Sequence, residues 1–113
     1  MSGLRRIPVR TRNEIIFVPV DSVAAVIADG ELLQITTRAG DRHVITYRLK
    51  DLEARLDPAQ FVRLSRGSLA NVDLIERVTP LSGGTYMVTL ATGQQLPVSR
   101  MRARVLRDQL FKL

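Results

Sequence analysis

Short β-branched runs separated by glycine-containing turns constrain this chain more than any other feature of its sequence. The runs Ile75–Leu81 and Thr85–Leu90, for example, are joined by Ser82-Gly83-Gly84. Glycine adopts the positive φ that tight hairpin turns need, and β-branched residues favour strands. The chain is therefore expected to be mainly β-structure, built from short antiparallel sheets and hairpins.

The same pattern predicts strands along most of the chain. Three successive strands between Val23 and Tyr47, with Gly30 and Gly40 in the turns between them, imply a meander. The polar segment Ser65–Ser68 is predicted to be a surface turn that carries an arginine outward. The expected strands are Ile7–Arg10, Glu14–Pro19, Val23–Ile27, Leu32–Thr37, Arg42–Tyr47, Phe61–Leu64, Ile75–Leu81, Thr85–Leu90 and Gln94–Val98.

Two segments have helical rather than strand periodicity. Leu49, Leu52 and Leu56 recur at helical spacing, and Pro58 closes the segment, which predicts one short central helix. Ser99 is a good N-cap for a C-terminal helix from Arg100 to about Phe111. Its predicted apolar stripe consists of Met101, Val105, Leu106 and Leu110.

The length of 113 residues fits a single domain over residues 1–113, and residues 1–6 are expected to be a flexible or linker segment. Seventeen Lys and Arg residues against eleven Asp and Glu give a formal charge of +6. Residues 100–113 hold four Arg and one Lys against one Asp, so much of the positive charge lies at the C-terminal end. This imbalance favours a polyanionic partner such as nucleic acid, although charge alone also fits a membrane surface.

Catalysis is not indicated by the residue types present. The sequence has no cysteine, its single histidine, His43, lies in a predicted strand, and no acidic cluster has metal-ligand spacing. We therefore expect neither an enzyme, nor a cofactor or metal, nor a small-molecule substrate. No run approaches the roughly 18 apolar residues that cross a bilayer, and the lack of cysteine gives no sign of an oxidising compartment, so a cytoplasmic location is expected.

Four motifs in a fixed order carry a family resemblance. They are LKDLEARL from Leu49, FVRLSRGSLANVDLI from Phe61, the Gly83-Gly84 hairpin, and LPVSR before the last helix. Their order and spacing resemble the LytTR DNA-binding domain family of LytR/AlgR response regulators, over about residues 7–110. Two departures concern base preference: Ser65-Arg66-Gly67 stands where the family usually has His-Arg-Ser, and Leu32 stands where an aromatic residue is often found.

The resemblance implies a bacterial transcription regulator whose loops, rather than a recognition helix, read successive major grooves of double-stranded DNA. It implies base contacts by Leu32 in the hairpin around Gly30, by Arg66, and by Arg100. Asn71 is expected to hold the loop backbone. Residues expected to contact the DNA backbone are Gln34, Arg42, Arg48, Arg63, Ser65 and Arg102.

Further partners are implied by the resemblance, and rival functions stay open. The domain is expected to bind direct repeats as a homodimer, and a longer parent protein could carry an upstream receiver or membrane domain. RNA or single-stranded nucleic-acid binding is one alternative, although an aromatic content of 4% offers few rings for base stacking. A protein-interaction module that uses the basic C-terminal helix is the other alternative.

Overall fold

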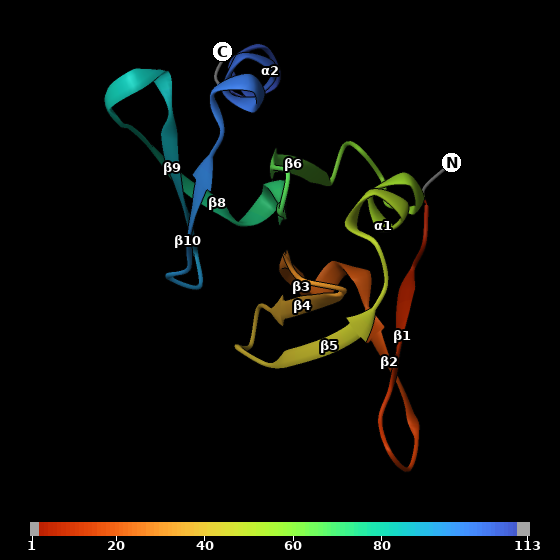
Figure 1. Cartoon of the computed structure of the whole chain (residues 1–113). Coiled ribbons are helices and arrows are strands. Elements are labelled where there is room, and N and C mark those ends of the chain that lie inside the picture. Colours follow the sequence, from red (N-terminus) through yellow and green to blue (C-terminus); the bar gives the residue numbers. More distant parts are fainter. Residues whose placement is uncertain (1–2, 111–113) are drawn as a thin grey trace.

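The computed structural model describes residues 3–110, which form three antiparallel sheets and two α-helices (Figure 1). The central sheet has the strand order β5-β4-β3-β7-β6, and a two-stranded and a three-stranded sheet flank it. The helices are α1 (Leu49–Arg55) and α2 (Arg100–Gln109). The strands are β1 (Arg6–Arg10), β2 (Ile15–Pro19), β3 (Val23–Asp29), β4 (Leu32–Thr37), β5 (Arg42–Thr46), β6 (Phe61–Ser65), β7 (Ser68–Asn71), β8 (Ile75–Pro80), β9 (Tyr86–Leu90) and β10 (Gln95–Val98), with 3-10 turns η1 (Val20–Ser22), η2 (Val72–Leu74) and η3 (Ser82–Gly84).

The predicted mainly β architecture is confirmed, and each predicted strand is present within one or two residues of its expected bounds. The β3-β4-β5 meander forms as expected, with Gly30 at a φ of 61° in its first turn. One strand, β7, was not predicted. All four of its residues are buried because it pairs between β3 and β6, so it lacks the in-and-out alternation that marks a half-exposed strand.

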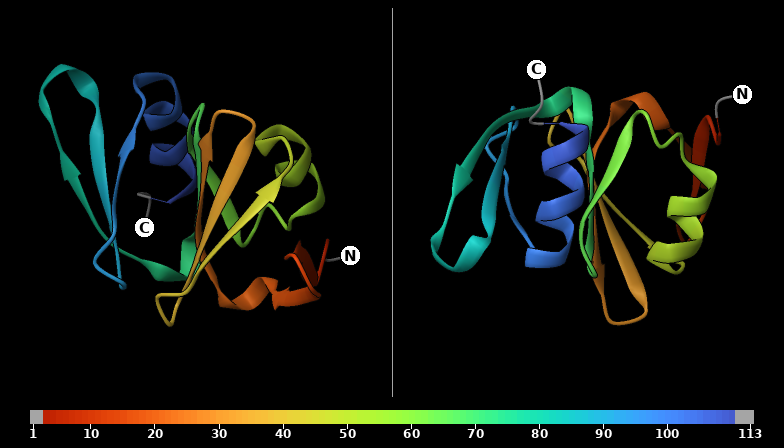
Figure 2. Two further views of the ribbon diagram at one scale, coloured as in Figure 1. Left: turned by 60° about the horizontal axis from the view of Figure 1, so that its bottom comes forward. Right: turned by 90° about the horizontal axis from the view of Figure 1, so that it is seen from above.

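The central sheet separates two hydrophobic cores. Figure 2 shows this sheet lying between α1 on one side and α2 on the other. Val26, Leu33 and Leu69 face the first core, which Leu52 of α1 and Ile7 of β1 complete. On the opposite face, Ala25, Leu64 and Ala70 pack against the β8-β9-β10 sheet and Leu106 of α2. The central strands, which are buried on both faces, therefore fix the loops at their ends relative to both helices.

The expectation of a flexible or linker segment at the N-terminus is wrong for residues 4–6. The amide of Leu4 donates to the carbonyl of Arg55 at 2.6 Å, and the Leu4 side chain packs against the first core. Arg6 begins β1 and pairs with Pro19. These contacts join the segment to α1 and β2, while residues 1–2 lie outside the described part of the chain.

The apolar stripe predicted for the last helix is wrong at two positions. Met101 is 80% exposed and Val105 is 42% exposed, whereas Ala103 and Leu106 are the buried residues of α2. The buried face follows from how α2 docks on β6, because a three-residue step from Ala103 to Leu106 returns to the same side of a helix. The helix ends at Gln109, and Phe111 lies outside the described residues.

Candidate nucleic-acid interface

Two turns that are far apart in the sequence lie side by side. The β3–β4 turn holds Gly30 and Glu31, and the β6–β7 turn holds Arg66 and Gly67. They meet because β3 pairs with β7 in the central sheet, and the amide of Ala28 donates to the carbonyl of Gly67 at 2.8 Å. This backbone bond sets the spacing between Arg66 and the β3–β4 turn.

A surface hollow joins these two turns to the start of α1. Gly30 and Glu31 line it from one side, Arg66 from another, and Tyr47 and Arg48 from the β5–α1 connection. Arg48 is the exposed N-cap residue of α1, and its side chain makes no capping hydrogen bond. The hollow thus brings together two of the arginines that the sequence singled out.

Arg63 stabilises the β6–β7 turn by hydrogen bonds to the backbone carbonyls of the turn. Its Nε donates to the carbonyl of Ser65 at 2.6 Å and its Nη2 donates to the carbonyl of Arg66 at 2.8 Å. Its Nη1 forms an ion pair with Glu53 of α1, and only 14% of its side chain is exposed. The Arg66 guanidinium, by contrast, is exposed and has no hydrogen bond or ion pair within residues 3–110.

Arg100 is positioned by the N-cap of its own helix and by two neighbouring segments. The Ser99 hydroxyl accepts from the amide of Arg102 at 3.3 Å, which confirms the predicted N-cap. The amide of Ser99 donates to the carbonyl of Leu64 at 3.0 Å, which joins the start of α2 to β6. The Nε of Arg100 donates to the carbonyl of Gly83 at 3.1 Å, so both terminal Nη groups stay available. Gly83 has a φ of 79°, which a side chain at this turn would strain.

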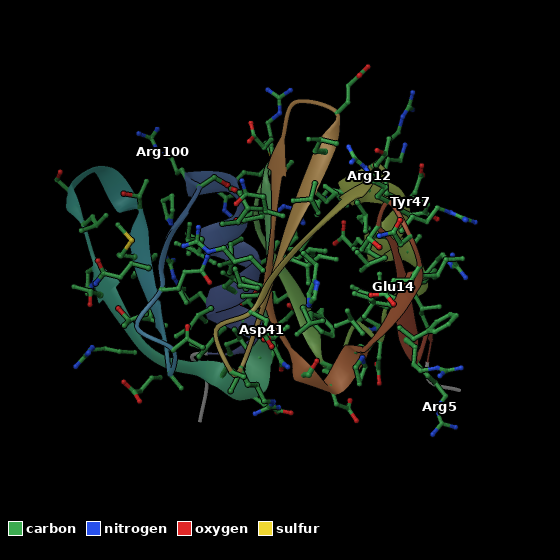
Figure 3. The ribbon with its side chains drawn as sticks, turned by 90° about the horizontal axis from the view of Figure 1, so that it is seen from below. Arg5, Arg12, Glu14, Asp41, Tyr47 and Arg100 are labelled. Carbon is green, nitrogen blue, oxygen red and sulfur yellow. The ribbon has the colours of Figure 1, made fainter. Side chains whose placement is uncertain are left out.

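These segments meet at one edge of the molecule. In Figure 3, Arg100 and the tip of the β3–β4 hairpin both point to the upper edge, whereas Asp41 lies toward the opposite side. Leu64, which accepts from Ser99, is two residues before Arg66 in the same strand and turn. The Arg66 turn and the start of the last helix therefore share one side of the fold rather than lying on opposite faces.

Not every predicted DNA-backbone contact is brought to this edge. Arg42 pairs with Thr36 at the end of β4 remote from the β3–β4 turn. Arg63 and Ser65 use their polar groups for hydrogen bonds within the turn. Arg63 donates to the carbonyl of Ser65, and the Ser65 hydroxyl contacts that of Ser68 at 3.0 Å and accepts from the amide of Gly67. Arg48 lines the hollow and Arg102 lies in the first turn of α2.

The two predicted positions on β4 lie on the same face of that strand. Leu32 begins β4 beside the turn and is 42% exposed. Gln34 follows it and is half-buried between Ile27 of β3 and Val44 of β5. Leu32 is therefore the residue of β4 closest to the β3–β4 turn, while Gln34 sits farther into the sheet.

Asn71 has the structural role that was predicted for it. Its side chain is fully buried, donates to the carbonyl of Val23 at 2.9 Å, and accepts from the amide of Asp73 at 3.0 Å. These bonds link β7 to the start of β3 and cap η2. Asn71 thereby supports the frame of the two turns from inside the fold.

Tyr47 is an aromatic residue that is 37% exposed and lines the hollow. Its position just after the end of β5 is the only local sign of this exposure, because the strand alternation stops there.

Within residues 3–110, no group of three acidic, histidine or cysteine side chains is placed to hold a metal ion. No helix in the same range has the length and apolar character needed to span a bilayer.

Comparisons with known proteins agree with this architecture. The RcoM 1 protein of Paraburkholderia xenovorans, a heme-containing CO-sensing transcriptional regulator, is 31% identical over 108 residues, covering 95% of this chain and 40% of that protein. The sensory transduction protein LytT of Bacillus anthracis is 28% identical, covering 95% of this chain and 43% of LytT. The chain thus spans less than half the length of these curated relatives.

A solved structure and a family pattern complete the comparison. A LytTr DNA-binding domain from Bacillus cereus superposes with a TM-score of 0.86 at 24% identity, covering 96% of this chain and 98% of that one, which shows the same fold. The pattern of the LytTr DNA-binding domain family matches residues 13–111. The chain therefore belongs to the LytTR family of DNA-binding domains.

Proposed function

We propose that this domain binds double-stranded DNA sequence-specifically, as the DNA-contacting part of a transcription regulator. Three segments read the duplex: the β3–β4 turn with Leu32, the β6–β7 turn with Arg66, and the start of α2 with Arg100. The molecule extends 46 Å along its longest axis, and one turn of B-DNA is about 34 Å long. Segments spread along one edge of such a molecule can enter successive major grooves.

The observation that carries the proposal is the shared edge of the arginine-bearing turns. The bonds from Ala28 to Gly67 and from Ser99 to Leu64 are both backbone hydrogen bonds within a folded sheet region. They hold the turns at fixed spacing before DNA arrives, so little conformational entropy is lost on binding. Arginines presented at fixed positions on the β6–β7 turn and at the start of α2 suit the regular spacing of phosphates and base edges in a duplex.

The contacts divide into base readers and phosphate binders. A free guanidinium end bonds both O6 and N7 of guanine, and Arg66 and Arg100 each present one. The Leu32 side chain suits the methyl group of thymine, which is an apolar contact in the major groove. Arg48 and Arg102 flank these positions and neutralise phosphates, with Gln34 as a weaker contact from farther along β4.

Duplex DNA fits the surface better than single-stranded nucleic acid does. Single-strand binders stack bases on exposed rings along a basic groove. Within residues 3–110 the most exposed rings are Phe17, which lies beneath Arg6 with a guanidinium-to-centroid distance of 4.8 Å, and Tyr47. Phe17 therefore lies under a cation of its own hairpin. In this proposal the domain acts by binding duplex DNA rather than by catalysis.

The domain works in the cytoplasm as part of a larger regulator, in this proposal. The curated relatives are more than twice as long as the matched region, since it covers 40–43% of each. An additional receiver or membrane domain then supplies the signal, and two copies bind direct repeats as a homodimer.

Selection from a random duplex library, followed by sequencing, tests the proposal. We expect enrichment of one motif, with conserved guanines one helical turn apart, and competition by that duplex but not by its single strands or by duplex RNA. Equal enrichment of all sequences, or preference for a single strand, would contradict sequence-specific duplex binding.

A further inference from the structure

The turn between β1 and β2 presents an arginine that the three reading segments leave unused. Thr11 closes this turn: its amide donates to the carbonyl of Glu14 at 2.8 Å, and its hydroxyl donates to the same carbonyl at 3.1 Å. The amide of Glu14 also lies 3.2 Å from the Thr11 hydroxyl. Arg12 is thus exposed on a closed turn, and its side chain has no hydrogen bond or ion pair among the described residues.

Arg12 lies on the same side of the molecule as the proposed interface. In Figure 3, Arg12 and Arg100 both lie toward the upper edge, whereas Glu14, at the other end of the β1–β2 turn, lies lower and away from that edge. In Figure 1, α2, the β3–β4 hairpin and the β1–β2 hairpin follow one another from the top to the bottom of the molecule. The β1–β2 turn therefore stands at the end of the row opposite to Arg100.

A continuous surface links this turn to the hollow at Arg66. Tyr47 lines that hollow together with Arg48 and Arg66. Tyr47 also lines a second hollow, between β1, β5 and α1, together with Arg10. Arg10 is the last residue of β1, two residues before Arg12. Exposed basic residues therefore continue from Arg66 through Arg48 to Arg10, with Tyr47 lining both hollows, and Arg12 follows Arg10 by two residues.

We infer that the β1–β2 turn is a fourth DNA contact, in which Arg12 binds a phosphate on the flank of the site. This inference rests on the proposed function, because it extends the same row of turns. A lone guanidinium at a turn tip, beyond the base-reading turns, suits the phosphate backbone, which is reached without entering a groove. The contact lengthens the bound segment of DNA on one side and adds affinity without changing base preference.

The experiment compares Arg12→Ala with Arg5→Ala on the duplex obtained by selection. Arg5 is also exposed and lies next to the same hairpin, but Figure 3 shows it at the opposite, lower edge. The two variants lose the same charge, so a general effect of net charge appears equally in both. Arg12→Lys keeps a cation at the turn. Each protein is titrated at several salt concentrations against the full duplex and against two duplexes that are shortened from one end or the other.

We expect Arg12→Ala to weaken binding of the full duplex by roughly fivefold at physiological salt and to reduce the salt slope by about 0.9, the value for one phosphate. Arg5→Ala should match the wild type, and Arg12→Lys should recover most of the slope. The wild type should bind one of the two shortened duplexes more weakly than the full duplex, by a similar factor. On that shortened duplex, Arg12→Ala and the wild type should have the same affinity.

Two outcomes overturn the inference while leaving the proposed function intact. In the first, Arg12→Ala binds the full duplex with the affinity and slope of the wild type. In the second, Arg5→Ala loses as much as Arg12→Ala. If the wild type itself does not prefer the selected duplex over random DNA, the proposed function fails instead, and this control is read before the variants.

Discussion

The guanidinium of Arg63 donates to the carbonyl of Arg66 at 2.8 Å, so one arginine of the strand-and-turn motif positions the next. The sequence resemblance predicted a DNA-backbone contact for Arg63. Its Nε, Nη1 and Nη2 are instead directed at Ser65, Glu53 and Arg66, and its side chain is largely buried. Arg63 is therefore expected to act on DNA through the turn that it supports.

Arg63→Met tests this role. We expect the free energy of unfolding to fall by about 1–2 kcal/mol, because the turn carbonyls lose a charged donor, and the salt slope of DNA binding to stay unchanged. Urea denaturation and salt-dependent titration measure the two quantities. Glu53→Gln removes the ion pair but keeps the two turn bonds, so it serves as the milder control. A slope reduced by about 0.9 with unchanged stability would support a phosphate contact instead.

Arg100→Ala should weaken binding of the cognate duplex by roughly fivefold to 150-fold, the equivalent of about 1–3 kcal/mol for a base-reading arginine. Base preference at one position should flatten, because no other side chain replaces the lost guanine contact. The matched control is Arg107→Ala, an exposed arginine near the other end of α2. Competition titrations with single-base variants of the site measure both effects, and equal losses on cognate and random DNA would refute the base-reading role.

Arg48→Ala and Arg42→Ala should separate two arginines that the resemblance treated alike. Arg48 lines the hollow with Arg66, whereas Arg42 lies at the far end of β4 and β5. We expect Arg48→Ala to lower the salt slope by about 0.9 on every duplex, and Arg42→Ala to leave it unchanged. The slopes come from titrations at several salt concentrations. A larger change for Arg42→Ala than for Arg48→Ala would mean that DNA approaches another edge of the sheet.

Asn71→Ala should lower the free energy of unfolding by about 2–3 kcal/mol, because it leaves the buried carbonyl of Val23 and the amide of Asp73 without their partners. Denaturant titration measures the loss. Asn13→Ala is the control, since Asn13 is an exposed asparagine in the β1–β2 turn. Two variants of equal stability would show that the Asn71 amide contributes no more than an exposed one.

Local patterns predicted most of the elements and the arginines at their ends. The turn at Gly30, the helix cap at Ser99 and strand β4 depend on residues close in sequence, and each formed as predicted. β7 could not be found in this way, because a strand buried on both faces lacks an alternating pattern. The buried face of α2 was also missed, since Met101 and Leu106 are both apolar and only the neighbouring β6 selects between them.

The sequence by itself determined the mainly β fold, the surface turns and the residue types that they carry, because turn, cap and strand preferences act over a few residues. Only the tertiary structure decided that the turns of Arg66 and Arg100 share one edge, that Arg63 is a support, and that Arg12 lies in the same row. The bonds responsible, from Ala28 to Gly67 and from Ser99 to Leu64, join backbone groups. Every non-proline residue carries the same amide and carbonyl, so the pairing of these groups is set by the packing of the whole sheet.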